Sequence, residues 1–229
     1  PLALELAASA LRRITLPQLG MLIQEEATWL HELHSPARDL PPRQRTLYQA
    51  IAWSYSLLDA PMQAIFRQVG VFVDGFTAAA AQAICGADPM TLALLTEHSL
   101  LVRIGERWRM LEMIREFALT QMPNAERSAI QQRHAAYFVA QPVTEIAVIA
   151  RDHANFRAAL IWTISRQEAA AALALCGKLC WFWETHGSLR EGLTLAQAVL
   201  AMPGMVDPNL RIDVLERVST LAWQSYQFD

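Results

Sequence analysis

The feature that most restricts the fold is one short stretch of alternating polarity in a chain otherwise patterned as helices. Residues 100–111 alternate with a period of two, and Gly105-Glu106 lies between the two arms. Glycine at the first central position favours a two-residue type II′ turn, so we predict a single β-hairpin. The alternation assigns its side chains to two faces: Val102, Ile104, Trp108 and Met110 on one, and Leu101, Arg103, Arg107 and Arg109 on the other.

Helix-start signals surround this hairpin. Asp59-Ala-Pro61 and Asp88-Pro89 each combine a capping residue with an early-turn proline, and Thr77 is a further cap. These signals predict helices over about 44–58, 59–72, 77–86 and 88–99 before the hairpin, and over about 112–121 after it. This is the order of a winged helix with one β-hairpin and an extra leading helix, which we place at residues 43–122.

The chain before this domain has a different pattern. Residues 1–34 are rich in alanine and leucine and predict two helices that are separated near Pro17. Residues 35–42 contain Pro36, Pro41 and Pro42, which lack backbone donors and fix φ, so we predict a linker there. Because the first residue is Pro1, we expect further chain to precede it.

Residues 124–229 are patterned as successive helices with short turns. We predict helices over about 124–140, 152–165, 168–186, 188–202 and 207–226, and leave 143–150 unassigned. Ser188-Leu-Arg-Glu191 has the spacing of a capping box. Paired helices of this kind predict an α-helical repeat array that continues beyond Asp229. The predicted fold class is therefore mainly α.

Composition argues against several classes of function. The net charge of −3 gives no long-range attraction to nucleic acid or to an anionic membrane. Three cysteines are too few and too odd in number for a disulfide framework, which favours a reducing cytoplasm. No apolar run reaches the roughly 18 residues of a membrane span. We expect a cytoplasmic protein without membrane contact.

Residues able to carry catalysis are sparse. Lys178 is the single lysine, and its surroundings lack both the glycine-rich cradle and the following hydroxyl of a P-loop. Val71-Phe-Val-Asp74 has the outline of a nucleotide-site strand, but the end of a helix with a turn at Asp74-Gly75 explains it better. We therefore predict that this chain alone is not an enzyme, and name no catalytic residue and no cofactor within it.

The candidate metal ligands have the wrong spacing or number. His31 and His34 are three apart, whereas the paired histidines of a zinc protease are four apart on one helical face. Cys176 and Cys180 are four apart on an apolar helix near His186, but no fourth ligand is evident, so buried thiols are the simpler interpretation. No metal site is predicted.

Two hypotheses remain open for the hairpin and for the tryptophans. The expected reading helix, 88–99, has no Arg or Lys, so we expect the winged helix to dock on protein. DNA binding remains the alternative, because Arg103, Arg107 and Arg109 give the hairpin positive charge. Trp181 and Trp183, together with Trp162 and Trp223, fit core packing or a groove for a ligand or protein partner.

Several segments in order resemble one family. Pro1-Leu-Ala-Leu-Glu-Leu-Ala-Ala is similar to the end of the G-L-P-L-A-L motif of STAND signalling ATPases, the class that includes NB-ARC proteins. The segments at 45–59, 71–77, 111–118, 155–162 and 181–192 resemble bacterial members described as LuxR-type or AfsR-like regulators. The resemblance covers nearly the whole chain, from the nucleotide domain's helical lid through the winged helix into a tetratricopeptide-like region.

The resemblance implies a function in transcriptional signal transduction. The full-length protein would bind ADP or ATP with Mg²⁺, and Pro1 would contact the adenine. Leu111 and Glu112 would occupy a Met-His-Asp position, where Leu111 cannot donate the usual hydrogen bond to phosphate. The expected partners are the protein's own nucleotide-binding domain and a ligand or protein at the repeats, with no DNA bound through this segment.

Overall fold

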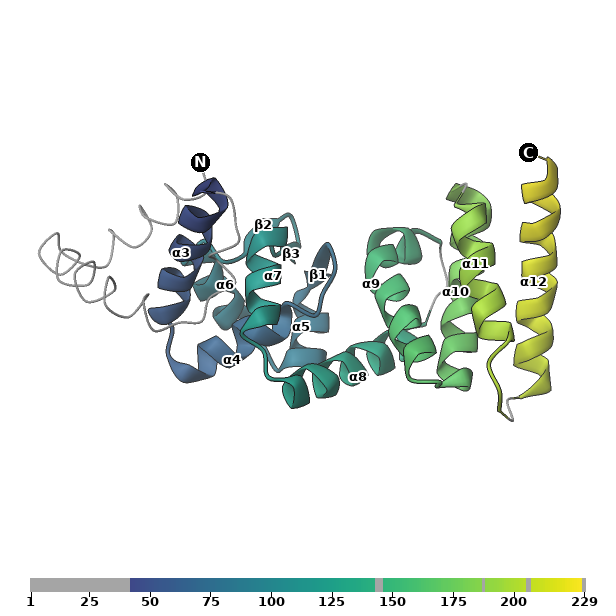
Figure 1. Cartoon of the computed structure of the whole chain (residues 1–229), viewed down its shortest axis with the longest axis horizontal. Coiled ribbons are helices and arrows are strands. Elements are labelled where there is room, and N and C mark those ends of the chain that lie inside the picture. The colour runs from purple at the N-terminus through teal and green to yellow at the C-terminus, as the bar shows by residue number, and fades with distance from the viewer. Residues whose placement is uncertain (1–41, 143–145, 187, 205–206, 228–229) are drawn as a thin grey trace, which may run out of the picture. The chain divides into compact units, whose positions relative to one another are not determined.

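The computed structural model describes residues 42–142, 146–186, 188–204 and 207–227. The predicted lid remnant (1–34), most of the linker, Pro1, His31 and His34 lie outside these residues. The described chain is mainly α-helical with three short strands, as predicted (Figure 1). It divides into two compact units: the first includes the chain up to Gly70 and Thr77–Pro123, and the second includes Val71–Phe76 and the chain from Asn124 onward.

The first unit has the predicted order of elements. Its helices and hairpin are α3 (Pro42–Ser56), α4 (Ala60–Val69), α5 (Ala78–Cys85), α6 (Pro89–Glu97), β2 (Val102–Ile104), β3 (Arg107–Arg109) and α7 (Glu112–Thr120). The side chains of Asp59, Thr77 and Asp88 accept from Met62 N at 2.9 Å, Ala80 N at 3.2 Å and Thr91 N at 2.7 Å. All three predicted caps are therefore confirmed.

The segment before α5 differs from the prediction. Helix α4 ends at Val69 instead of continuing to residue 72, and Asp74 adopts a positive φ of 73°. A short strand that was not predicted from the sequence follows, β1 (Gly75–Thr77). The sheet order is β1-β3-β2. A strand of this length leaves no alternation to detect, and the turn at Asp74 separates it from the apolar run before it.

The hairpin is confirmed, but the predicted assignment of its faces is wrong. Gly105 adopts a φ of 59°, as a type II′ turn requires, and Arg103 lies opposite Trp108 while Ile104 lies opposite Arg107. Opposite residues share a face, so Val102 and Ile104 share one with the β3 arginines. Accordingly Val102 and Ile104 are 39% and 58% exposed, whereas Leu101, Trp108 and Met110 are buried on the other face.

The second unit contains five helices among its described residues. They are α8 (Asn124–Ala140), α9 (Ile146–Ser165), α10 (Ala169–His186), α11 (Leu189–Leu200) and α12 (Pro208–Gln227). Each packs on the next, and α10 also packs on α8 and α12 (Figure 1). Helix α9 begins earlier than predicted, with a kink at Asp152 where φ is −113°. Packing on both the next helix and the next but one is the arrangement of stacked helix pairs.

The predicted capping box before α11 does not form. Ser188 makes no side-chain bond to the helix, and its φ and ψ of −82° and 42° lie outside the extended region of a capping residue. Glu191 instead accepts a hydrogen bond from Nε of Arg157 on α9. The Glu191 carboxylate, which a capping box would need, is thus engaged in an ion pair between α9 and α11.

Candidate functional site

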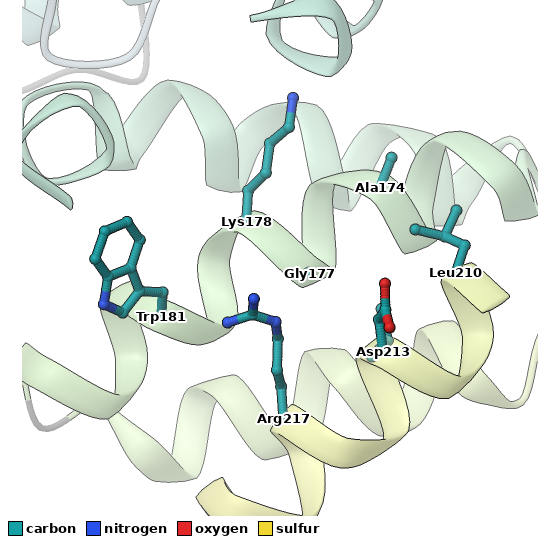
Figure 2. Close-up of a pocket in the computed structure, with 8 residues that line it drawn as sticks. Ala174, Gly177, Lys178, Trp181, Leu210, Asp213 and Arg217 are labelled. Carbon is teal, nitrogen blue, oxygen red and sulfur yellow. The ribbon is translucent and has the colours of Figure 1, made fainter. Parts of the chain in front are cut away.

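One candidate site in the described chain is a groove between α10 and α12. It has a volume of about 240 Å³. Each helix contributes residues at positions i, i+3, i+4 and i+7, which is one helical face. The lining residues are Ala174, Gly177, Lys178 and Trp181 from α10, and Leu210, Asp213, Val214 and Arg217 from α12 (Figure 2).

The floor of the groove is apolar. It is formed by Ala174 and Gly177 of α10 and by Leu210 and Val214 of α12. A Cβ at Gly177 would lie 3.5 Å from Cγ2 of Val214, so the two helices are already close at this point. Val214 is buried, whereas Leu210 is half-buried and open to the groove. A ligand that filled this groove would displace water from its apolar surface.

The charges of the groove come from α12. Asp213 and Arg217 are one turn apart and exposed, and among the described residues neither takes part in an ion pair. Figure 2 shows both side chains extending from α12 toward α10. The groove therefore offers a carboxylate and a guanidinium to a ligand without first breaking an existing ion pair.

Lys178 has a different role from the other charged residues. Its ammonium donates to the carbonyl oxygens of Phe138 at 3.1 Å, Gln141 at 2.8 Å, and Val139, at the end of α8. Figure 2 shows the side chain pointing away from α12. Burial lowers the pKa of this amine. Because its donors are used at the α8 terminus, Lys178 contributes its methylene chain to the groove rather than a charge.

The two predicted tryptophans lie in different environments. Trp181 is half-buried on the groove, whereas Trp183 is 0% exposed and packs on Gly192 of α11. A ring with no accessible surface has none to offer a partner in this conformation, so only Trp181 belongs to the candidate site. Trp223 is 64% exposed on α12 but does not line the groove.

The structure does not bring the three hairpin arginines together. The Arg103 guanidinium lies 5.1 Å from the centre of the Trp108 ring, and its Nε donates to Gly105 O at 3.0 Å. Arg107 and Arg109 lie on the opposite face, with the exposed Val102 and Ile104. That outer face is thus a strip with apolar side chains along β2 and basic side chains along β3.

The helix expected to read DNA has an unsuitable surface. Helix α6 buries Leu92 and Leu95, and its exposed residues include Met90, Ala93 and Glu97. None of these donates a hydrogen bond from its side chain to a base edge, and Glu97 repels phosphate.

Leu111 and Glu112 lie at the start of α7. Leu111 is the N-cap residue and makes no side-chain capping bond. Glu112 accepts from Arg115 at 2.9 Å, and this hydrogen bond is the main reason why its pKa is lowered. In the described chain the carboxylate is engaged in stabilising the helix start.

No cluster of His, Cys, Asp and Glu among the described residues could hold a metal ion. Cys176 and Cys180 are buried thiols, in line with the simpler interpretation of their spacing. No single described helix is both long enough and apolar enough to cross a membrane. Helices α5 and α6 meet these two criteria only when they are taken together, and they are bent by 104° where they join.

Asp213, Arg217 and Gly177 were not predicted as site residues. The sequence pattern that could have indicated them is the i, i+3, i+4, i+7 spacing shared by residues 174–181 and 210–217. That spacing becomes informative only when α10 and α12, which are not consecutive, are known to pack together.

Comparisons with known proteins give one group of relatives. "Putative HTH-type transcriptional regulator Rv0890c" of Mycobacterium tuberculosis strain H37Rv is 29% identical over 222 residues, covering 87% of this chain and 25% of the relative. "Putative HTH-type transcriptional regulator Mb0914c" of Mycobacterium bovis gives the same values. The chain spans about a quarter of the length of these relatives. No family model and no solved structure matches the chain.

Proposed function

We propose that this chain is a regulatory coupling segment of a cytoplasmic transcriptional regulator, in which the second unit binds a protein or peptide ligand and the first unit transmits the bound state. Two observations support this role. The relatives are named as HTH-type transcriptional regulators. The exposed surface of α6 favours protein over DNA.

The observation that carries the proposal is the α10–α12 groove. Trp181 offers an aromatic face, and Asp213 and Arg217 offer opposite charges beside an apolar floor. Sites for whole small molecules usually measure about 300–1,000 Å³, so a groove of this size suits one or two side chains of an extended peptide. Tryptophan and arginine are also the residues that most often dominate the affinity of protein contacts.

Selection from random peptides displayed on phage tests this proposal directly. We expect the intact chain to enrich peptides whose affinity falls roughly 30-fold or more in Trp181→Ala and Arg217→Ala variants. Trp223→Ala is the matched control, because that indole is exposed on α12 outside the groove. Equal loss in all three variants, or no enrichment by the intact chain, would refute a peptide-binding groove.

For the full-length protein we propose a STAND-type ATPase with a tetratricopeptide-like sensor, in which the winged helix contacts the nucleotide-binding domain. ADP or ATP with Mg²⁺ would bind to that domain, with Pro1, Leu111 and Glu112 near the nucleotide by resemblance. The chain described here would not turn over ATP by itself. Titrating it into the separately purified nucleotide-binding domain, with ADP and then with ATP, should give affinities that differ between the two nucleotides.

One observation favours a second candidate, DNA binding by the hairpin. Arg107 and Arg109 lie together on its outer face, as phosphate contacts would require. A gel shift with duplex DNA over a range of salt concentrations separates the candidates. Specific binding below micromolar concentration, weakening steeply with salt, would reverse the ranking.

A further inference from the structure

The segment at residues 71–76 lies between α4 and α5 of the first unit in sequence, yet it belongs to the second unit. The chain leaves the first unit after Gly70 and returns to it at Thr77. Two connections of the backbone therefore flank a segment that is held by the helices of the other unit.

Asn155 of α9 binds the backbone of this segment at two points. Its side-chain oxygen accepts from Val73 N at 2.8 Å, and its side-chain nitrogen donates to Gly75 O at 2.9 Å. Asn155 is 1% exposed, so water does not replace these bonds at low cost. The amide side chain supplies both the acceptor and the donor that these two backbone groups need, whereas a carboxylate accepts only and an apolar residue does neither.

Aromatic packing surrounds these two hydrogen bonds. Phe72 and Phe76 are stacked with their ring centres 4.4 Å apart, and Phe72 meets the buried His134 ring edge-on at 5.7 Å. His134 of α8 also lies 3.4 Å from the Asn155 oxygen through Nε2. The segment is thus held by α8 and α9 together, and a shift of one helix against the other would strain it.

We propose that Asn155 couples the two units, because it ties the 71–76 segment to the α8–α9 pair. When α8 and α9 move relative to each other, the bonds to Val73 and Gly75 break, and the change reaches α4 and α5 through the backbone on either side. This mechanism rests on the proposed function, in which the second unit binds a ligand and the first unit transmits the bound state. It adds the residues through which that state would pass from one unit to the other. Asn155 is a positioning residue and does not line the α10–α12 groove.

Hydrogen exchange on the intact chain tests the mechanism. In Asn155→Ala we expect the Val73 amide to exchange at least tenfold faster, and the last turn of α4 and the first turn of α5 to exchange faster with it. Thr163→Val is the matched control, since Thr163 is 0% exposed on the same helix and its hydroxyl donates only to Leu160 O, at 2.9 Å. The control should leave all these amides unchanged.

Two outcomes of this comparison would overturn the proposal. Equal acceleration in Thr163→Val would show general loosening of α9, and acceleration at Val73 without any change in α4 and α5 would show attachment without coupling. If alanine prevents folding, Asn155→Asp replaces it, because aspartate keeps an acceptor for Val73 N but loses the donor to Gly75 O. The aspartate variant should accelerate α4 and α5, and unchanged exchange there would also overturn the proposal. Peptide selection by Trp181 and Arg217 variants is a separate readout, since both residues lie outside this network.

Discussion

A methyl group added to Gly192 would lie 2.7 Å from Cδ2 of Trp183, which is closer than a carbon atom can approach an indole ring. Trp183 is fully buried, so its ring has no room to shift. We expect Gly192→Ala to destabilise the second unit by about 1–3 kcal/mol through overpacking, reduced by up to about 1 kcal/mol from the higher helix propensity of alanine. Urea denaturation followed by circular dichroism measures the difference.

Gly177 provides the matched control for that substitution. It also lies within a helix, but its added Cβ would meet Val214 Cγ2 at 3.5 Å, an ordinary contact distance. We therefore expect Gly177→Ala to be neutral or more stable by up to about 1 kcal/mol. Equal effects of the two substitutions would contradict the packing described here.

The stability of the second unit should depend on pH through His134. Burial lowers the pKa of His134 from 6.5 to about 4, while its hydrogen bond with Asn155 acts in the opposite direction. Between these two values the unfolded chain binds more protons, so stability rises with pH across this window and is lost as pH falls through it. A difference of this size corresponds to about 3 kcal/mol.

Denaturation at several pH values tests this dependence. His134→Phe keeps an aromatic ring against Phe72 and Phe138 but cannot be protonated. We expect it to remove most of the pH dependence between pH 6.5 and about 4. If the variant keeps the slope of the parent chain, another group is responsible, and His153, whose pKa is also lowered by burial, would be the next to replace.

The cysteines should be unreactive in the folded chain. The hydrogen bond with Cys180, followed by burial, raises the pKa of the Cys176 thiol, and only thiolates react readily. Cys85 and Cys180 are buried as well. We expect no labelling by a maleimide at neutral pH until urea unfolds the chain, when all three should react. Stoichiometric labelling of the folded chain would contradict this burial.

Features set by neighbouring residues were predictable from the sequence. The caps at Asp59, Thr77 and Asp88 depend on contacts three residues away, and all three form. The hairpin itself follows from Gly105, but its faces were assigned by continuing the alternation through the turn. A two-residue turn places Ile104 opposite Arg107, so the alternation changes face there.

Features that depend on distant residues were not predictable. The groove requires α10 and α12 to pack on each other, although α11 lies between them in the sequence. Nothing local in either helix indicates that pairing. Asn155 is the single amide side chain of α9, and its partners at Val73 and Gly75 lie about 80 residues earlier. Likewise Glu191 pairs with Arg157 of another helix instead of capping its own.

Lys178, the single lysine of the chain, should stabilise the end of α8 rather than bind a ligand. Its ammonium donates to three carbonyl groups that have no partner within the helix, and a cation at this end also interacts favourably with the helix dipole. We expect Lys178→Met to lower the free energy of unfolding by about 1–3 kcal/mol, because the carbonyl groups lose charge-assisted bonds. Arg133→Met, which removes an exposed charge from α8, should change stability by less than about 0.5 kcal/mol. Urea denaturation of both variants compares them, and peptides selected by the groove should retain their affinity for Lys178→Met. A loss of peptide affinity with unchanged stability would instead assign Lys178 to ligand binding.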